Sequence, residues 1–279
     1  MNIISVIKLK KNDQEYEIKF IQQGLNSLEK QKKFNGQKLL HPFQTKTIEE
    51  SNTIYDKFKK KNIVKNTKTL IYSEDFLSQE IKNDIEEADR FELKHDGSCG
   101  MMFFDGEKFV PYARYDIKKD TNGLFGIPPL NSIACEEKPL DILTTHWPHF
   151  VQCNKDPKAY KWHLYAFDKM IKSGKVENLK TSFTCEYMGK KFNYKKSDPI
   201  EDEGIIVPHG LIILEIPKEL RNYEGFFQIF LQIPYIEGLI IYGKNNLWKI
   251  RKNMFFFDGK RFEWPSKESK KLSEIVMLS

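Results

Sequence analysis

Apolar and polar residues alternate in two short stretches near the start of the chain, ISVIKLK at residues 4–10 and EYEIKFI at residues 15–21. This period of two predicts two β-strands, each with one face turned toward a core. The polar sequence KKNDQ between them predicts a tight turn. We therefore expect residues 1–24 to form an antiparallel pair of strands.

Three later stretches favour helices. Residues 45–66 are polar and lysine-rich, and we expect them to be helical in part. In residues 74–91, apolar side chains recur at nearly helical spacing, which predicts a helix. Ser73 or Asp75 is its expected N-cap. Residues 158–172 predict a helix that Gly174 ends.

From Phe91 onward the chain consists mainly of short apolar runs between turn signals, and we expect an α+β fold of mostly antiparallel strands with helices to one side. The nearly all-apolar run GLIILEI should lie inside a sheet. We divide the chain into an N-terminal strand and helix extension, residues 1–70, and a catalytic domain, residues 71–279. The expected strands are FELK, GMMFF, KFVPYARYDI, TSFTCEYMG, GIIVPHGLIILEI, EGLIIYG and LWKIRK.

Composition narrows the class of protein. The 279 residues carry a net charge of +6, with lysine clusters such as KFKKKN and KKFNYKK. Such clusters suit a polyanion or a phosphate-bearing ligand, and a solvated Lys/Glu surface is an equal alternative. The four cysteines form no C-x-x-C pair, which argues for a reducing compartment and against a zinc ribbon. We expect no signal peptide and no membrane span, which favours a cytoplasmic protein and leaves a nuclear location open.

Lys94 is the first candidate for chemistry, because it ends the strand-like FELK and precedes the turn signal Asp96-Gly97. One interpretation is a solvated turn between two strands. The other is a lysine held in a pocket, where partial desolvation and nearby cations lower its pKa and make the neutral amine a nucleophile.

Two carboxylates stand in similarly apolar surroundings. Glu186 lies in TSFTCEYMG, where it must be solvated, paired or functional, because burial of an unpaired carboxylate is costly. Glu237 precedes a glycine and an apolar run, a place that suits an oxygen-preferring metal such as magnesium. The plain alternatives are an edge-strand glutamate and a strand-start residue.

Lys249 and Arg251 alternate with Trp248 and Ile250, so a strand would place both cations on one face. Two neighbouring cations repel each other unless an anion lies between them, and a phosphate would supply that anion. A basic outer face of an edge strand is the alternative.

The order Lys-x-Asp-Gly, strand glutamate, Glu-Gly before an apolar run, then Lys-x-Arg resembles the covalent nucleotidyltransferase superfamily of ATP-dependent ligases and capping enzymes. The resemblance implies that Lys94 becomes nucleotidylated and that Glu237 is associated with the metal. It also implies ATP and Mg²⁺ as cofactors, with Mn²⁺ as a substitute. The residues it places at the nucleotide are Glu92, Leu93, Asp96, Gly97, Arg114, Glu186, Phe192, Lys249 and Arg251.

The branch of the superfamily follows from two features. Lys252 is followed by 27 residues, since the chain ends at residue 279, and this is too short for a C-terminal OB domain. Cys99 stands where many DNA ligases carry an arginine. Stretches such as HWPHFV, CEYMGKKFNY and EGLIIYG are similar to the auto-adenylylating 5′-to-3′ RNA ligases of eukaryotes and some viruses, which implies a 5′-phosphate and a 3′-hydroxyl RNA end as partners.

Other assignments stay open. The chain could be a DNA-nick ligase or a GTP-using capping enzyme, which the labelling nucleotide and the acceptor would distinguish. It could also be a degenerate RNA-binding module that forms no covalent adduct. His146 and His149 we expect in a loop rather than as zinc ligands, and His209 in a turn near the nucleotide pocket.

Overall fold

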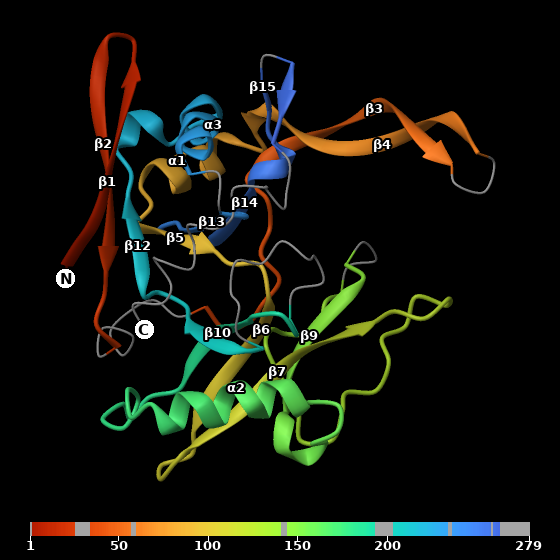
Figure 1. The fold of residues 1–279 in the computed structure, drawn as a ribbon, viewed down its shortest axis with the longest axis vertical. Helices are drawn as coiled ribbons and strands as arrows, with labels where there is room; N and C mark the ends of the chain where they lie inside the picture. The colour runs from red at the N-terminus through yellow and green to blue at the C-terminus, as the bar shows by residue number, and fades with distance from the viewer. Residues whose placement is uncertain are drawn as a thin grey trace.

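The fold contains two six-stranded, mostly antiparallel sheets, one above the other in Figure 1. The computed structural model describes residues 2–25, 34–56, 60–140, 144–192, 203–233, 236–257 and 259–262. The chain is thus α+β, as the sequence predicts. We call the two sheets the upper and the lower sheet, as they stand in Figure 1.

The upper sheet has the order β1-β2-β12-β5-β13-β14, and every neighbouring pair in it is antiparallel. Both predicted N-terminal strands belong to it, and the run GLIILEI supplies an inner strand. Its members are β1 (Asn2–Lys11), β2 (Gln14–Gln22), β5 (Arg90–Lys94), β12 (Ile212–Glu215), β13 (Gly238–Tyr242) and β14 (Leu247–Arg251).

The lower sheet has the order β11-β10-β6-β7-β9-β8. The expectation of a loop at His146 and His149 is wrong, because both residues lie in β9, which pairs with β7 along its whole length. The strands are β6 (Ser98–Phe104), β7 (Phe109–Lys118), β8 (Ile133–Ala134), β9 (His146–Gln152), β10 (Phe183–Met188) and β11 (Ile205–Pro208).

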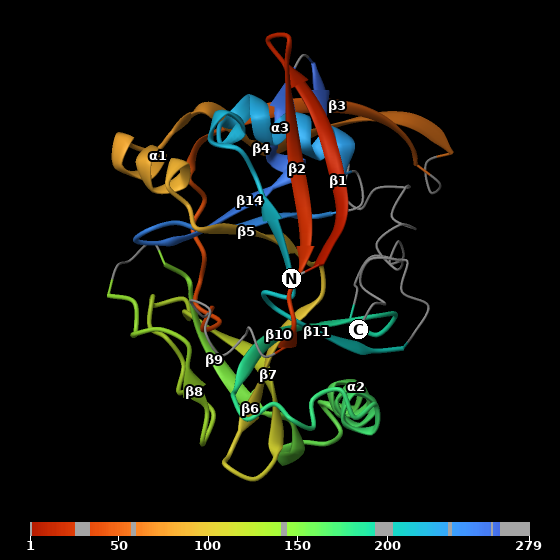
Figure 2. The same ribbon diagram turned by 90° about the vertical axis from the view of Figure 1, so that its left-hand side faces the viewer.

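Helices cover the outer faces of the sheets (Figures 1 and 2). Helix α2 (Lys161–Lys172) packs on the lower sheet and ends before Gly174, as predicted. Helix α1 (Gln79–Glu86) is shorter than predicted, because the Ser78 hydroxyl, not Ser73 or Asp75, caps it. Helix α3 (Tyr223–Gln232), which the sequence analysis missed, is buried against the upper sheet.

Three short 3-10 helices lie wholly within the described residues: η2 (Cys153–Lys155), η3 (Lys218–Leu220) and η4 (Lys252–Met254). No helix in the described part of the chain is both long and apolar enough to cross a membrane.

A long two-stranded hairpin of β3 (Phe43–Asp56) and β4 (Lys61–Phe76) projects from the upper half of the molecule (Figure 1). The prediction of a partial helix at residues 45–66 is therefore wrong. Threonine and isoleucine recur through this stretch, and β-branched side chains favour extended backbone over helix. Residue 70, where we divided the chain, lies inside β4.

A second small hairpin, β15 (Phe256–Phe257) with β16 (Lys260–Arg261), lies near the root of the first. The expectation that no OB domain follows Lys252 depends mostly on residues 263–279, which are outside the described residues.

Two of the places where the described chain crosses between the sheets lie beside each other. Residues 95–97 lead from β5 in the upper sheet to β6 in the lower, and residues 209–211 lead from β11 back up to β12. The Asp96-Gly97 signal therefore marks a crossing and not a hairpin. A Cβ atom on Gly97 would lie 2.3 Å from the Tyr187 carbonyl oxygen, so only glycine fits where the crossing touches β10.

Asp84 of α1 ties the β13–β14 hairpin to the helix. Its buried carboxylate accepts hydrogen bonds from the Asn245 backbone N–H and the Trp248 indole N–H, both at 2.7 Å, and from the Asn246 backbone N–H at 3.3 Å. Each buried donor that loses its acceptor costs about 1–3 kcal/mol. Asp84 thereby fixes the position of the strand that carries Lys249 and Arg251.

We expect Asp84→Ala to lower the free energy of unfolding by about 3 kcal/mol, because two well-aligned donors lose their partner together. Urea denaturation would measure the loss. The matched control is Asp89→Ala, whose side chain is exposed at the next turn and should leave the unfolding midpoint nearly unchanged. Equal, small effects of both changes would contradict the assigned role of Asp84.

Candidate functional site

The lower face of the upper sheet carries a block of polar side chains set by strand register. Lys94 and Glu92 alternate along β5 and lie opposite Gly238 and Ile240 of β13. Those two residues in turn lie opposite Arg251 and Lys249 of β14. Since paired residues on neighbouring strands share a face, Lys94, Glu92, Lys249 and Arg251 all point to the same side, as predicted for the basic pair.

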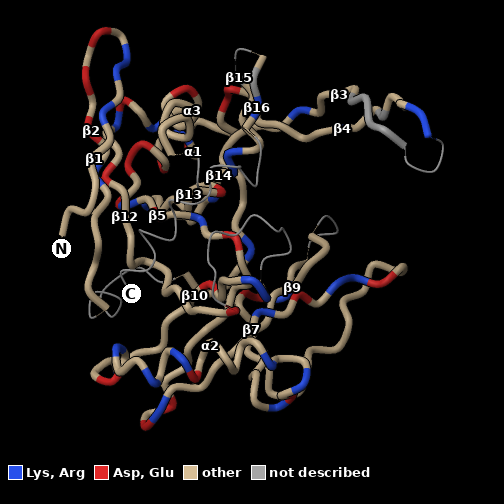
Figure 3. The backbone as a smooth tube through the Cα atoms, in the orientation of Figure 1, with Lys and Arg blue, Asp and Glu red and all other residues tan. Residues whose placement is uncertain are grey.

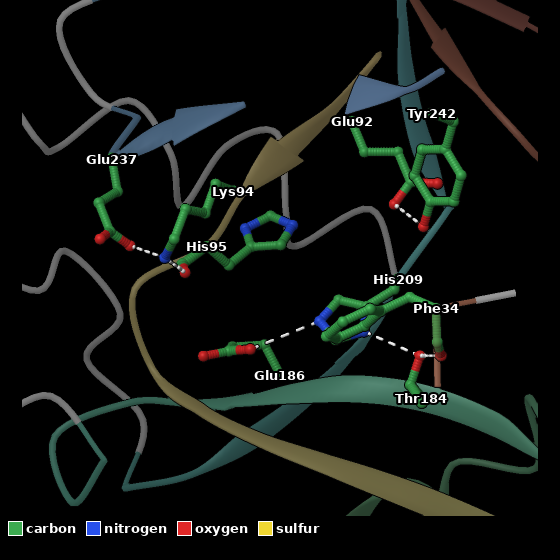
Figure 4. A network of polar contacts seen from close by, with 9 residues as sticks. All are labelled: Phe34, Glu92, Lys94, His95, Thr184, Glu186, His209, Glu237 and Tyr242. Atoms are coloured by element: carbon green, nitrogen blue, oxygen red, sulfur yellow. Dashed lines mark hydrogen bonds and ion pairs between the residues drawn. The ribbon is translucent and has the colours of Figure 1, made fainter. Parts of the chain in front are cut away.

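Glu237 lies between two of these cations, Lys94, which Figure 4 shows beside it, and Arg251. Its carboxylate contacts the Lys94 ammonium through one oxygen, and its other oxygen lies 3.3 Å from the Arg251 guanidinium. Gly238 makes this arrangement possible, because a Cβ atom there would lie 1.9 Å from the Ile250 carbonyl oxygen. Burial raises the pKa of Glu237 above its ordinary value, against the opposing effects of Lys94 and Arg251.

Lys249 is partly buried among other cations, and this changes the acidity of its amine. Burial, together with the positive charges of Arg251 and Lys94, lowers the pKa of its amine to about 8. An anion bound beside Lys249 would favour the charged form. The site is thus short of negative charge around Lys249.

The lower sheet provides the facing wall. Glu186 lies on β10 between β6 and β11, so it is not on a solvent-facing edge strand. Its side chain is only 13% exposed, and one carboxylate oxygen lies 3.4 Å from Nε2 of His209 in the second crossing. His209 is thus in a turn at the cavity, as the sequence predicts.

The hydrogen bonds around His209 define its protonation pattern (Figure 4). The Thr184 hydroxyl donates to the Phe34 carbonyl oxygen at 2.9 Å, so at 3.0 Å it accepts from Nδ1 of His209. With the proton on Nδ1, the Nε2 atom can donate to Glu186 only when the ring is positively charged. His209 therefore connects Glu186, through the Thr184 hydroxyl, to the segment that carries Phe34.

Arg114 and Cys99 also belong to the lower wall of the cavity. Arg114 of β7 lies 3.1 Å from Asp116 on its own strand. Cys99 of β6 pairs with Glu186 in the ladder, and burial raises the pKa of its thiol, so it is neutral at ordinary pH. Cys99 is therefore a neutral neighbour of Glu186.

These residues enclose a cavity of about 560 Å³ between the sheets. At one end the buried carboxylate of Glu92 accepts hydrogen bonds from Arg90 at 2.8 Å and from the Tyr242 hydroxyl at 3.1 Å. The cavity is lined by Phe34, Gln37, Lys38, Leu39, Glu92, Leu93, Lys94, His95, Gly97, Ser98, Cys99, Arg114, Asp116, His146, Glu186, His209, Ile240, Tyr242, Lys249 and Arg251.

Most of the predicted site residues thus meet at one cavity. Asp96 is in the crossing, close enough to Glu237 for its charge to act on that carboxylate. Glu237 does not line the cavity itself but contacts Lys94, which does. Phe192 lies apart from these residues. It packs on the α2 side of the lower sheet, with its ring stacked at 5.4 Å on buried Tyr187, and it does not line the cavity.

Several lining residues escaped the sequence analysis. Residues 34–40 run from the lower sheet to the upper: the Lys38 N–H donates to Glu136 at 3.0 Å, and the Leu40 carbonyl accepts from the Lys249 N–H at 2.9 Å. This segment brings Phe34 and Lys38 to the cavity. The one signal for this segment in the sequence is the Asn-Gly dipeptide at residues 35–36, and that dipeptide predicts only a turn.

No protein-family model, curated protein or solved structure matches this chain. The site's chemistry therefore follows from its own geometry. That geometry combines a lysine amine beside a buried carboxylate, a group of cations with too few anions, and a partly open cavity large enough for a nucleotide-sized ligand.

The acidity of Lys249 gives a direct test of the site's electrostatics. We expect its amine to titrate at about pH 8, well below the ordinary 10.5, and Arg251→Ala to raise that value by removing the nearest like charge. The pH dependence of amine acetylation, read by peptide mass spectrometry, would measure both. Exposed Lys244 is the internal control. Identical titration of Lys249 and Lys244 would contradict the assignment.

Proposed function

We propose that this chain is an ATP-dependent RNA ligase of the covalent nucleotidyltransferase type, which joins a 5′-phosphate RNA end to a 3′-hydroxyl end through a lysyl-AMP intermediate. The observation that carries the proposal is the position of Lys94. Its amine contacts the buried carboxylate of Glu237 on the upper-sheet side of the cavity, which Lys249, Arg251 and Arg114 also line.

Lys94 would act as the nucleophile and Glu237 as its base. The amine must lose a proton before its nitrogen attacks phosphorus, and Glu237 is in direct contact with it. A carboxylate whose pKa is raised by burial accepts that proton more readily than an exposed one. The N–P bond then forms at the α-phosphate, the P–O bond to pyrophosphate breaks, and AMP stays on Lys94 as a phosphoramidate.

The basic pair supports charge that develops on the phosphates. Lys249 and Arg251 share the face of the upper sheet with Lys94, and Arg114 faces them from the lower sheet. Cations fixed in position before the reaction stabilise negative charge without having to reorganise. The lowered pKa of Lys249 also fits this role, because a bound phosphate supplies the missing anion.

The remaining carboxylates and rings suit the nucleoside. Glu186 is free on one side of its carboxylate to accept a hydrogen bond from a ribose hydroxyl, while His209 holds the other side. Glu92 retains acceptor capacity beyond Arg90 and Tyr242. Phe34, rather than Phe192, is an aromatic side chain that the cavity offers to a base.

The donor set also fits a magnesium ion. Magnesium in nucleotide enzymes is held by one or two carboxylates together with phosphate oxygens, and Glu237 with Asp96 nearby provides that number. When bound, such an ion would neutralise part of the charge on the phosphates. Among the described residues, no group of three or more His, Cys, Asp or Glu forms a self-sufficient metal cage.

Two transfers complete the reaction. An oxygen of the RNA 5′-phosphate attacks the AMP phosphorus, the N–P bond breaks, and Lys94 recovers its amine. The 3′-hydroxyl oxygen of the second end then attacks the activated 5′-phosphate, AMP leaves, and a phosphodiester is formed.

The first test is covalent labelling. With α-labelled ATP and magnesium we expect a labelled protein band that survives denaturing electrophoresis, and Lys94→Ala should abolish it while leaving the unfolding midpoint close to that of the wild type. Exposed Lys108→Ala is the matched control and should keep full labelling. Labelled RNA ends then serve to detect joining.

The outcomes separate the candidate functions. Labelling by GTP alone would replace the proposal with capping chemistry, and joining of nicked DNA but not RNA would replace it with a DNA ligase. No label from either nucleotide, in protein whose intact mass carries no AMP, would indicate a binding module and defeat the proposal.

The two phenylalanines give a second test. Base–aromatic stacking is worth about 1–3 kcal/mol, so we expect Phe34→Ala to slow adduct formation at low ATP by about 10-fold or more. Phe192→Ala should instead lower stability, because its ring packs on Tyr187. Labelling rates and urea midpoints, measured on both variants, would check this. A larger labelling defect in Phe192→Ala would restore Phe192 as the base-stacking residue.

A further inference from the structure

The hairpin of β3 and β4, which we call the β3–β4 arm, is anchored firmly at its root. Phe43 and Tyr72 are buried, and Phe43 packs at 4.6 Å on Phe76 and at 6.3 Å on Phe226 of α3. The Tyr72 hydroxyl accepts a hydrogen bond from the Arg251 backbone N–H at 3.2 Å. The arm therefore begins directly behind the basic pair of the cavity.

Beyond this root the arm leaves the body of the protein (Figure 1). Its strands pair only with each other. Among the described residues, the outermost contact between the arm and the rest of the chain joins Glu50 to Arg261. An isolated two-stranded hairpin is marginally stable by itself. The described side chains of its outer part that are exposed include Lys60, Lys61, Asn62, Val64 and Asn66.

Charge is distributed unevenly along the arm. Near the root, Glu49 and Glu50 are each close to a cation, Lys68 at 3.7 Å and Arg261 at 2.9 Å. Figure 3 shows basic residues at the described end of β4, where Lys60 and Lys61 lie. The outer stretch 51–66 contains one acidic residue, Asp56, and five basic ones by sequence: Lys57, Lys59, Lys60, Lys61 and Lys65.

The arm is long enough to contact a ligand far from the cavity. Eleven residue steps along β4 separate Lys61 from Tyr72. At about 3.3 Å per residue, the basic tip is roughly 36 Å from the root. A nucleic acid strand with about 3.4 Å per nucleotide would cover this distance with about 10 nucleotides.

We propose that the β3–β4 arm binds the sugar-phosphate backbone of the RNA substrate, about 10 nucleotides from the end that reacts at Lys94. This inference rests on the proposed function, which supplies RNA as the substrate. The position and charge of the arm suit a polyanion whose end lies at the cavity. Exposed lysines along a strand of phosphates contribute affinity through counterion release, without sequence preference.

A second explanation for the lysines is protection of free strand edges. Charged side chains on an unpaired edge prevent edge-to-edge association, and the arm has two such edges. This explanation predicts no effect of the tip on RNA, whereas the proposal predicts an effect that depends on both RNA length and salt.

The test compares Lys60→Ala/Lys61→Ala with wild type by fluorescence anisotropy, using a 5′-phosphate RNA of about 24 nucleotides and one of about 6, without magnesium. The matched control is Lys8→Ala/Lys10→Ala, two exposed lysines on the β1–β2 hairpin at the other side of the molecule (Figure 1). All four lysines are at the surface, so each variant should fold.

For the long RNA we expect the tip variant to bind about 3- to 10-fold more weakly. The slope of log affinity against log salt should become shallower by about 1.4, because two phosphate contacts on a single strand are lost. The short RNA should bind both proteins equally, and ATP labelling of Lys94 should be unchanged.

Unchanged affinity and salt slope for the long RNA would overturn the proposal and leave edge protection as the role of the lysines. An equal loss for the short RNA, or an equal loss in the β1–β2 control, would overturn it too. Failure of Lys94 labelling in every protein would reject the ligase assignment alone, because the length-dependent binding is measured without catalysis.

Discussion

The arrangement of the site depends on one close approach, that of the crossing at Lys94–Gly97 to strand β10. Gly97 touches the Tyr187 backbone so closely that a single added carbon has no room. This contact fixes the distance between the two sheets at the point where the chain passes from one to the other. Lys94 therefore faces Glu186 and Arg114 across a gap of defined width, and the cavity is a product of backbone packing rather than of flexible side chains.

The charges of the cavity are balanced only in part within the protein. Glu237 is in contact with two cations, Lys94 and Arg251, while Lys249 is left partly buried among positive neighbours. Such an arrangement costs stability without a ligand and is relieved when an anion binds, which is the pattern expected of a phosphate site. A solvated basic edge, the plain alternative for Lys249 and Arg251, would leave the acidity of Lys249 near its ordinary value.

Sequence periodicity predicted the strands that alternate clearly, such as β1, β2 and β14, and the register of β14 then placed Lys249 and Arg251 on one face. Several of its failures concern contacts that periodicity does not reveal. Phe192 looked available but is stacked on Tyr187, and Phe34 is held at the cavity by contacts that include the bond of its carbonyl oxygen to Thr184, 150 residues away. Asp-Gly at 96–97 signals a turn, yet nothing local says whether the next strand returns to the same sheet.

The interleaving of the sheets also sets an order for folding on the ribosome. All strands of the lower sheet come from one continuous stretch, residues 98–208, and can associate as soon as that stretch has been synthesised. The upper sheet takes strands from both the N-terminal and the C-terminal parts of the chain. The ladder between β2 and β12, which pairs Gln22 with Ile212, can form only after residue 212 has been synthesised. The nascent N-terminal hairpin therefore emerges long before its partner and keeps an open edge through most of translation, when a chaperone or a neighbouring chain can reach it.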